Sequence, residues 1–167
     1  MPGAPRIHGP MTRPFSVLLV EDDDPLRAVL FELLRQRGWH VHTASRGDEA
    51  VEMARRVEID FSILDLHLPG LNGLEVYRRI CAEIRPLPSI LMSGEASGEE
   101  ARRALELGMV EFLRKPLELD RLRRALDELV RRTAAGFPAD PPHGDPARSL
   151  PVRLDDLWPR PPRRRRR

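Results

Sequence analysis

The 167-residue sequence predicts an α/β fold, a doubly wound parallel sheet of five strands with five helices. Five short segments of strand length, most of them apolar runs, alternate with five longer segments that repeat apolar residues at helical spacing. This alternation requires right-handed crossovers, which place helices on both faces of the sheet. The chain length suits one well-buried domain. Twelve of the 17 prolines lie before Phe15 or after Arg132, and this composition marks the ends of that domain.

The predicted strands differ in how far they are buried. FSVLLV, DFSILD and PSILMS are mostly apolar runs, which are typical of strands covered on both faces. WHVHTA alternates instead, which indicates an edge strand with His40 and His42 at the surface. VEFL is a short last strand. In chain order, the strands are expected at residues 15–20, 39–44, 60–65, 88–93 and 110–113.

Capping residues set the boundaries of the predicted helices. Pro25 suits the first turn of the first helix, and Gly38 can end it. Ser45 is the expected N-cap of the second helix, and Ser97 that of the fourth, which Gly108 ends. The third helix is expected to bury a face formed by Leu74, Tyr77, Cys81 and Ile84. In chain order, the helices are expected at residues 25–38, 46–57, 72–84, 97–108 and 117–132.

Composition separates the two ends from the middle of the chain. Residues 1–14 and 133–167 are rich in proline, glycine and arginine, and are predicted to be flexible arms. Residues 163–167 carry five positive charges, so that the formal net charge of +2 leaves 2 − 5 = −3 for the rest. Cys81 is the only cysteine, which excludes an internal disulfide and favours a reducing, cytoplasmic location. No apolar run approaches the ~20 residues of a membrane-spanning helix.

Carboxylates follow two of the buried strands. Glu21 and Asp22 end the first strand, and Asp65 ends the third. If the strand order is 2-1-3-4-5, both ends face the crevice where the winding direction reverses. Three carboxylates at one point repel unless a cation neutralises them, and oxygen ligands suit Mg²⁺. Acids at a helix start also favour the helix dipole; this explains Asp23 and Asp24, which precede Pro25, but not Asp65.

Four motifs, VLLVEDD, ILDLHLPGLNGLEV, ILMSGEAS and EFLRKPLE, stand in order at the strand ends. Over residues 15–132 the chain therefore resembles the receiver domain of two-component response regulators. The resemblance implies a flavodoxin-like fold and Mg²⁺ as cofactor. It also implies that a sensor histidine kinase or phosphotransfer protein passes a phosphoryl group to an aspartate. Such a domain is not an enzyme beyond assisting its own phosphorylation and dephosphorylation.

The resemblance assigns a role to each matching residue. Asp65 resembles the phosphoacceptor, and Asp22 and Glu21 the acidic pair, which bind magnesium directly and through water respectively. The backbone carbonyl of His67 is expected as a further ligand. The remaining positions are Ser93 as the switch hydroxyl, Phe112 as the aromatic switch, and Lys115, the only lysine, as the lysine that pairs with the acceptor. The bond between Lys115 and Pro116 is predicted to be cis.

The chain departs from the family pattern near these positions. Gly94 replaces the usual alanine, and Phe112 lacks the hydroxyl of the frequent tyrosine. The side chain of His67 stands where it influences the access of water to the acyl phosphate.

Three other functions compete with a phosphorylatable receiver. An aspartate-nucleophile phosphatase of the haloacid dehalogenase type needs a second aspartate where His67 stands. A nucleotide- or flavin-binding module needs a phosphate loop, but EDDDPLR repels phosphate without a metal. A degenerate receiver that only docks to other proteins would not need the acidic pair, Ser93 and Lys115.

The output is expected to be a protein contact. No DNA-binding domain is recognisable after Arg132, which favours a stand-alone receiver with a downstream protein target. An exposed charged face on the fourth and fifth helices could form a homodimer; it comprises Glu99, Arg102, Arg103, Arg121 and Arg124. In the tail, Leu154, Leu157 and Trp158 precede the run of five arginines at residues 163–167. This is either a docking motif with an anchor for nucleic acid or acidic lipid, or, as we prefer, an unselected extension.

Overall fold

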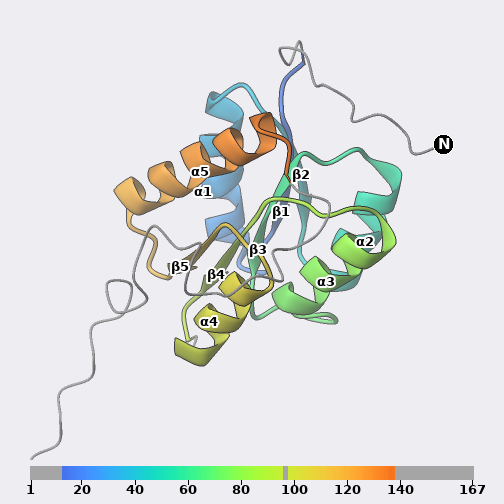
Figure 1. Cartoon of the computed structure of the whole chain (residues 1–167). Helices are drawn as coiled ribbons and strands as arrows, with labels where there is room; N and C mark the ends of the chain where they lie inside the picture. The colour runs from blue at the N-terminus through green and yellow to red at the C-terminus, as the bar shows by residue number, and fades with distance from the viewer. Residues whose placement is uncertain (1–12, 96–97, 138–167) are drawn as a thin grey trace, which may run out of the picture.

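The computed structural model describes residues 13–95 and 98–137. Five parallel strands form one sheet in the order β2-β1-β3-β4-β5, as predicted (Figure 1). The strands are β1 (Ser16–Val20), β2 (His40–Ala44), β3 (Phe61–Asp65), β4 (Ser89–Ser93) and β5 (Glu111–Arg114). The helices are α1 (Asp24–Gln36), α2 (Gly47–Arg56), α3 (Gly73–Glu83), α4 (Gly98–Glu106) and α5 (Leu119–Ala134). The predicted doubly wound α/β fold is confirmed.

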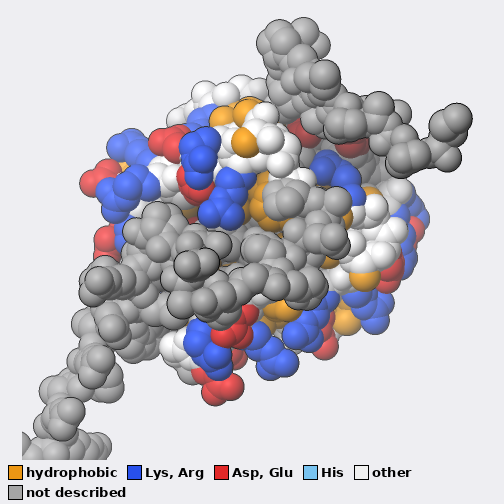
Figure 2. Space-filling view, in the orientation of Figure 1, with side chains coloured by type: hydrophobic (Ala, Val, Ile, Leu, Met, Phe, Trp, Pro, Cys, Tyr) orange, Lys and Arg blue, Asp and Glu red, His pale blue; other side chains and the backbone are white. Residues whose placement is uncertain are grey.

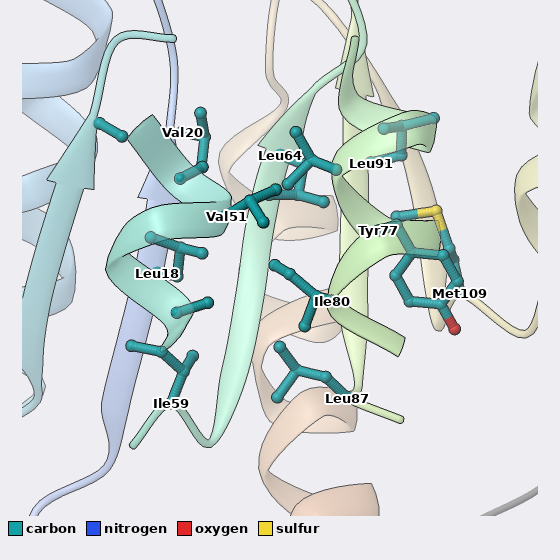
Figure 3. Packing of buried hydrophobic residues seen from close by; sticks show 14 of the residues in the cluster. Leu18, Val20, Val51, Ile59, Leu64, Tyr77, Ile80, Leu87, Leu91 and Met109 are labelled. Carbon is teal, nitrogen blue, oxygen red and sulfur yellow. The ribbon is translucent and has the colours of Figure 1, made fainter. Parts of the chain in front are cut away.

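Two hydrophobic clusters fill the two faces of the sheet. Side chains of a strand alternate between faces, so Leu18 and Val20 join one cluster while Val17 and Leu19 join the other. The first cluster packs against α2, α3 and α4, and Figure 3 shows part of it. The second packs against α1 and α5, where the buried residues of α5 are Leu122, Ala125, Leu126 and Leu129. Burial on both faces explains the apolar runs in β1, β3 and β4.

The start and end of α1 follow the predicted chemistry. The side chain of Asp23 accepts a hydrogen bond from the backbone N–H of Leu26 at 2.8 Å, which caps the helix. Pro25 lies in the first turn, where no intrahelical N–H is needed. Gly38 has a φ of 80°, the left-handed conformation in which a helix commonly ends. Asp24 forms an ion pair with Arg27.

Two sequence predictions, on the start of α2 and on the surface position of His42, are wrong in detail. α2 begins at Gly47 after Arg46 as N-cap, and the Ser45 hydroxyl contacts the Glu49 carboxylate instead of capping. His40 is exposed, but His42 is half-buried, and its Nε2 lies 3.1 Å from Oγ of Ser16 on the neighbouring strand. Ser97, the predicted cap of α4, lies outside the described residues.

The buried face of α3 is rotated relative to the prediction. Val76, Tyr77 and Ile80 are buried, whereas Ile84 follows the end of the helix and is 40% exposed. Asn72 caps α3 and forms a reciprocal pair of hydrogen bonds with Glu75, so the capping box fixes where the helix begins.

No helix among the described residues is both long and apolar enough to span a membrane. The arms predicted at residues 1–14 and 133–167 lie mostly outside the described residues.

Candidate functional site: an acidic cluster at the carboxyl edge of the sheet

Three carboxylates from two neighbouring strands meet at the carboxyl edge of the sheet. Glu21 and Asp22 follow β1, and Asp65 is the last residue of β3, which pairs directly with β1. One carboxylate oxygen from each residue lies within 4.8 Å of the others. Glu21 is fully buried and Asp65 is 4% exposed, while Asp22 faces solvent. The sheet order therefore brings these three predicted residues together at the switch point.

Lys115 supplies the opposite charge. Its Nζ lies 2.7 Å from Oε2 of Glu21 and 3.1 Å from Oδ2 of Asp65. The lysine follows β5, and its backbone N–H donates to the carbonyl of Ser93 at 2.8 Å. The peptide bond between Lys115 and Pro116 is cis, as predicted. Burial alone would lower the pKa of Lys115, but its contacts with Glu21 and Asp65 outweigh this effect and raise the pKa.

One oxygen of the cluster has no hydrogen-bond donor among the described residues. Oε2 of Glu21 is buried, and its close contact with Lys115 does not have hydrogen-bond geometry. Burial raises the pKa of Glu21, with a smaller contribution in the same direction from the charge of Asp65. A single ammonium facing three carboxylates leaves the cluster short of positive charge. Carboxylate oxygens in this state are the donor set that a hard divalent cation prefers, so the residues fit Mg²⁺.

Local contacts hold the acidic loop after β1 in place. The backbone N–H of Asp23 donates to Oε1 of Glu21 at 3.2 Å. Nη1 of Arg27, on the first turn of α1, donates to the backbone carbonyl of Glu21 at 2.8 Å. Arg27 therefore ties the helix to the loop that carries the acidic pair. This positioning role was missed in the sequence, because nothing in the spacing of Arg27 distinguishes it from a solvated arginine.

Gly73 holds the loop after β3. Its N–H donates to the carbonyl of Leu66 at 3.0 Å, and a Cβ on Gly73 would lie 2.2 Å from the backbone oxygen of Asp65. Only glycine therefore allows α3 to begin so close to the acceptor. The Asn-Gly dipeptide predicted a turn, but not this close approach. The spacing of Asn72 and Glu75 is the signal that could have located the helix start.

The remaining predicted residues surround the cluster at different depths. Ser93 is fully buried, and its hydroxyl accepts a hydrogen bond from the N–H of Glu95 at 3.3 Å. Phe112 is buried in the cluster that packs against α3 and α4, and its strand neighbour is Leu91. The side chain of His67 is exposed, while its N–H lies 3.4 Å from Oδ1 of Asp65. Among the described residues, no hydrogen bond or ion pair joins the side chain of Ser93, Phe112 or His67 to the side chain of Lys115.

Comparison with known proteins identifies the family of domains that shares this sequence pattern. Residues 17–127 match the model of the response regulator receiver domain. A probable transcriptional regulatory protein, TcrX of Mycobacterium tuberculosis, is 32% identical over 121 residues, which are 72% of this chain and 52% of TcrX. The chain thus spans about half the length of the curated relatives it matches.

Solved structures agree with the sequence match. The non-phosphorylated HemR receiver domain of Leptospira biflexa is 34% identical, with a TM-score of 0.65 over 70% of this chain and 94% of that one. The receiver domain of Ssk1, solved with the histidine phosphotransfer protein Ypd1 from Saccharomyces cerevisiae, is 26% identical. Its TM-score is 0.65 over 73% of this chain and 92% of that one. The sheet order, the acidic cluster and these matches lead to one conclusion: the chain belongs to the receiver domain family of two-component response regulators.

Proposed function

We propose that Asp65 accepts a phosphoryl group from a histidine kinase or a phosphotransfer protein, and that Mg²⁺ is required. The observation that carries this proposal is the pairing of an almost buried aspartate with Lys115 beside two further carboxylates. Receiver domains bind Mg²⁺ at such an acidic pocket, and they are switches and not multi-turnover enzymes. The likeness to the Ssk1 receiver, which was solved with its phosphotransfer protein, supports the same kind of donor.

The reaction is a transfer between two nucleophiles. A carboxylate oxygen of Asp65 attacks phosphorus and forms a P–O bond, while the P–N bond to the donor histidine breaks. The imidazole leaves with the electron pair and takes a proton from solvent. Lys115 already contacts Asp65 and compensates negative charge as the phosphoryl oxygens approach. When bound, Mg²⁺ supplies further charge neutralisation; Glu21, Asp22, Asp65 and the carbonyl of His67 would hold it.

The proposed switch links the acceptor to a protein-docking face. Ser93 and Phe112 lie on the same face of the adjacent strands β4 and β5. Movement of the Ser93 hydroxyl toward a phosphoryl group would open space for the Phe112 ring, and the α4–β5–α5 face would repack. Exposed charges on α4 and α5 make this face suitable for a downstream protein or for a second copy. We retain residues 15–132 as the proposed extent of the signalling domain.

Intact mass measurement tests the proposal. After incubation with a small phosphodonor and Mg²⁺, the chain is expected to gain one phosphoryl group, and Asp65→Asn is expected to gain none. Asp127→Asn serves as a control, because this exposed aspartate pairs only with Arg37, at 2.9 Å, in the part of the chain that the structure describes. Mg²⁺ removal with a chelator should abolish the gain in the unmodified chain.

Other outcomes identify the competing functions. Continuous release of phosphate over many turnovers would support an aspartate-nucleophile phosphatase. No gain of mass under any condition would support a degenerate receiver that acts only by docking.

A further inference from the structure

A cavity lies at the edge of the domain opposite the acidic cluster. It has a volume of about 210 Å³ and opens between the C-terminal ends of α2 and α3. Its floor includes Ile59, Ile80 and Leu87, which Figure 3 shows together at one end of the hydrophobic cluster. The volume is below the ~300–1,000 Å³ that is typical of small-molecule sites. The cavity therefore suits one or two side chains of a peptide segment.

The rim of this cavity combines arginines with an exposed apolar residue. Arg55 and Arg56 lie on the rim, but Glu52 and Glu83 already neutralise them. Arg85 differs, because its guanidinium donates to the backbone carbonyl of Ile59 and no described carboxylate lies within ion-pair distance. Acidic and basic side chains are intermixed over the face shown in Figure 2.

The apolar part of the rim is open to solvent. Ile84, next to Arg85, is 40% exposed and lines the same cavity. A partner must therefore offer apolar side chains to the floor and to Ile84, and an acid to Arg85. Peptide-docking sites typically have an apolar centre that accepts an aromatic side chain and a polar rim around it.

One segment of this chain has that composition. Residues 154–158 read LDDLW, in which two aspartates stand between leucines and a tryptophan follows. Arginine and proline are the most frequent residues in the rest of the tail, and residues 154–158 are the part of it that combines adjacent acids with large apolar residues. The segment complements the cavity in both charge and hydrophobicity.

The segment can also reach the cavity. Helices that follow parallel strands run back along the sheet, so α5 ends at the same edge as α2 and α3 (Figure 1). The described chain continues to Phe137, which packs against the second hydrophobic cluster. Seventeen residue steps separate Phe137 from Leu154. A flexible chain of that length has a root-mean-square span of about 20–25 Å and a maximum near 60 Å, enough to pass around the edge of the domain.

We propose that residues 154–158 dock into the cavity between α2 and α3 of the same chain. Trp158 and Leu157 occupy the apolar floor, and the carboxylate of Asp155 or Asp156 pairs with Arg85. The tether favours this occupant over a separate molecule, because it supplies an effective concentration of about 1 mM. The contact lies away from Asp65 and does not depend on phosphorylation.

Hydrogen exchange of the full chain tests the docking. The reporter amides are those of Ile84 and Arg85, which donate to the carbonyl of Ile80 at the end of α3. If the free segment binds with a Kd of about 0.1 mM, the tether slows exchange of these amides about tenfold relative to an undocked chain. The double variant Leu157→Ser, Trp158→Ser is the undocked reference, and its changes lie outside the described fold.

Charge reversal tests the polar contact. Arg85→Glu is expected to lose the protection, and adding Asp155→Arg and Asp156→Arg to it should restore protection. Arg79→Glu is the matched control, an exposed arginine of α3 that does not line the cavity. Thermal unfolding checks that each variant is folded; should Arg85→Glu unfold, the tail variants alone decide the question.

Two results would overturn the proposal. Equal exchange rates in the unmodified chain and the Leu157→Ser, Trp158→Ser variant would show that the segment does not dock. Protection that grows with protein concentration would place the segment of one chain in the cavity of a second copy, which contradicts docking within one chain.

Discussion

Replacement of Gly73 by alanine should damage both stability and phosphorylation. A Cβ at this position would lie 2.2 Å from the backbone oxygen of Asp65 and 2.9 Å from Cδ1 of Leu91. Ordinary contact begins at 3.4 Å, so the backbone of the acceptor and the start of α3 must separate by 3.4 − 2.2 = 1.2 Å. Because one of the two contacts is backbone, a change of side-chain rotamer cannot relieve it.

The expected magnitudes follow from this displacement. Overpacking of this kind costs about 1–3 kcal/mol. The better helix propensity of alanine offsets up to about 1 kcal/mol of this cost, so we expect a net loss of up to about 3 kcal/mol in the free energy of unfolding. A shift of about 1 Å at a reacting group slows a reaction about 100-fold. We therefore expect a similar loss in the rate of Asp65 phosphorylation.

Two assays on the same variant separate these effects. Urea denaturation measures the free energy of unfolding, and intact mass over time measures phosphorylation by a small phosphodonor with Mg²⁺. Gly98→Ala is the control, because among the described residues no atom outside its own helix turn and chain neighbours lies within 4 Å of the added Cβ. A Gly73→Ala variant that phosphorylates at the normal rate would refute the argument that this contact positions the acceptor.

Two further substitutions test the charges of the domain. Lys115→Met leaves Glu21 and Asp65 without their cation, so we expect a loss of up to about 3 kcal/mol in Mg²⁺-free urea denaturation. Mg²⁺ at a hundredfold excess over its Kd should restore about 2.7 kcal/mol; no response to Mg²⁺ would contradict a cation site. Glu128 bonds to Arg131, which lowers the pKa of Glu128 from 4.5 to about 2. A lowered folded-state pKa stabilises the fold above pH 4.5 and ceases to do so as the pH falls toward 2. Glu128→Gln should therefore lose about 0.5–1 kcal/mol at pH 7 and less at pH 3, in urea denaturation at both values; a loss independent of pH would disprove this coupling.

The sequence predicted best where the physical signal was local. Apolar runs located β1, β3 and β4, because a parallel strand buried on both faces needs apolar side chains on both, and alternation located the edge strand β2. Pro25 and Gly38 marked the ends of α1, because their backbone preferences act without help from the rest of the fold. Glu21 and Asp65 lie at the ends of two predicted strands, so the proximity of their carboxylates could be predicted from the sequence.

The sequence predicted the buried face and the first residue of a helix less well, because contacts between elements determine them. Ile84 has the right spacing to face the core, yet α3 ends before it and leaves it exposed at the cavity. Ser45 is a good N-cap by type, but the close packing of Gly47 against the backbone of Leu71 begins α2 later. Periodicity and propensity give the type of an element, while contacts between elements fix its rotation and its first residue.

The sequence by itself thus determined the kind of fold and the residue types at its reactive edge. Only the tertiary structure decided that Lys115 contacts Glu21 and Asp65 together, that Arg27 and Gly73 hold the loops beneath them, and that Arg85 lacks an acidic partner among the described residues. The physical reason is that strand and helix patterns depend on neighbours in the chain. A contact between residues 50 positions apart, such as that of Lys115 with Asp65, depends on how whole elements pack.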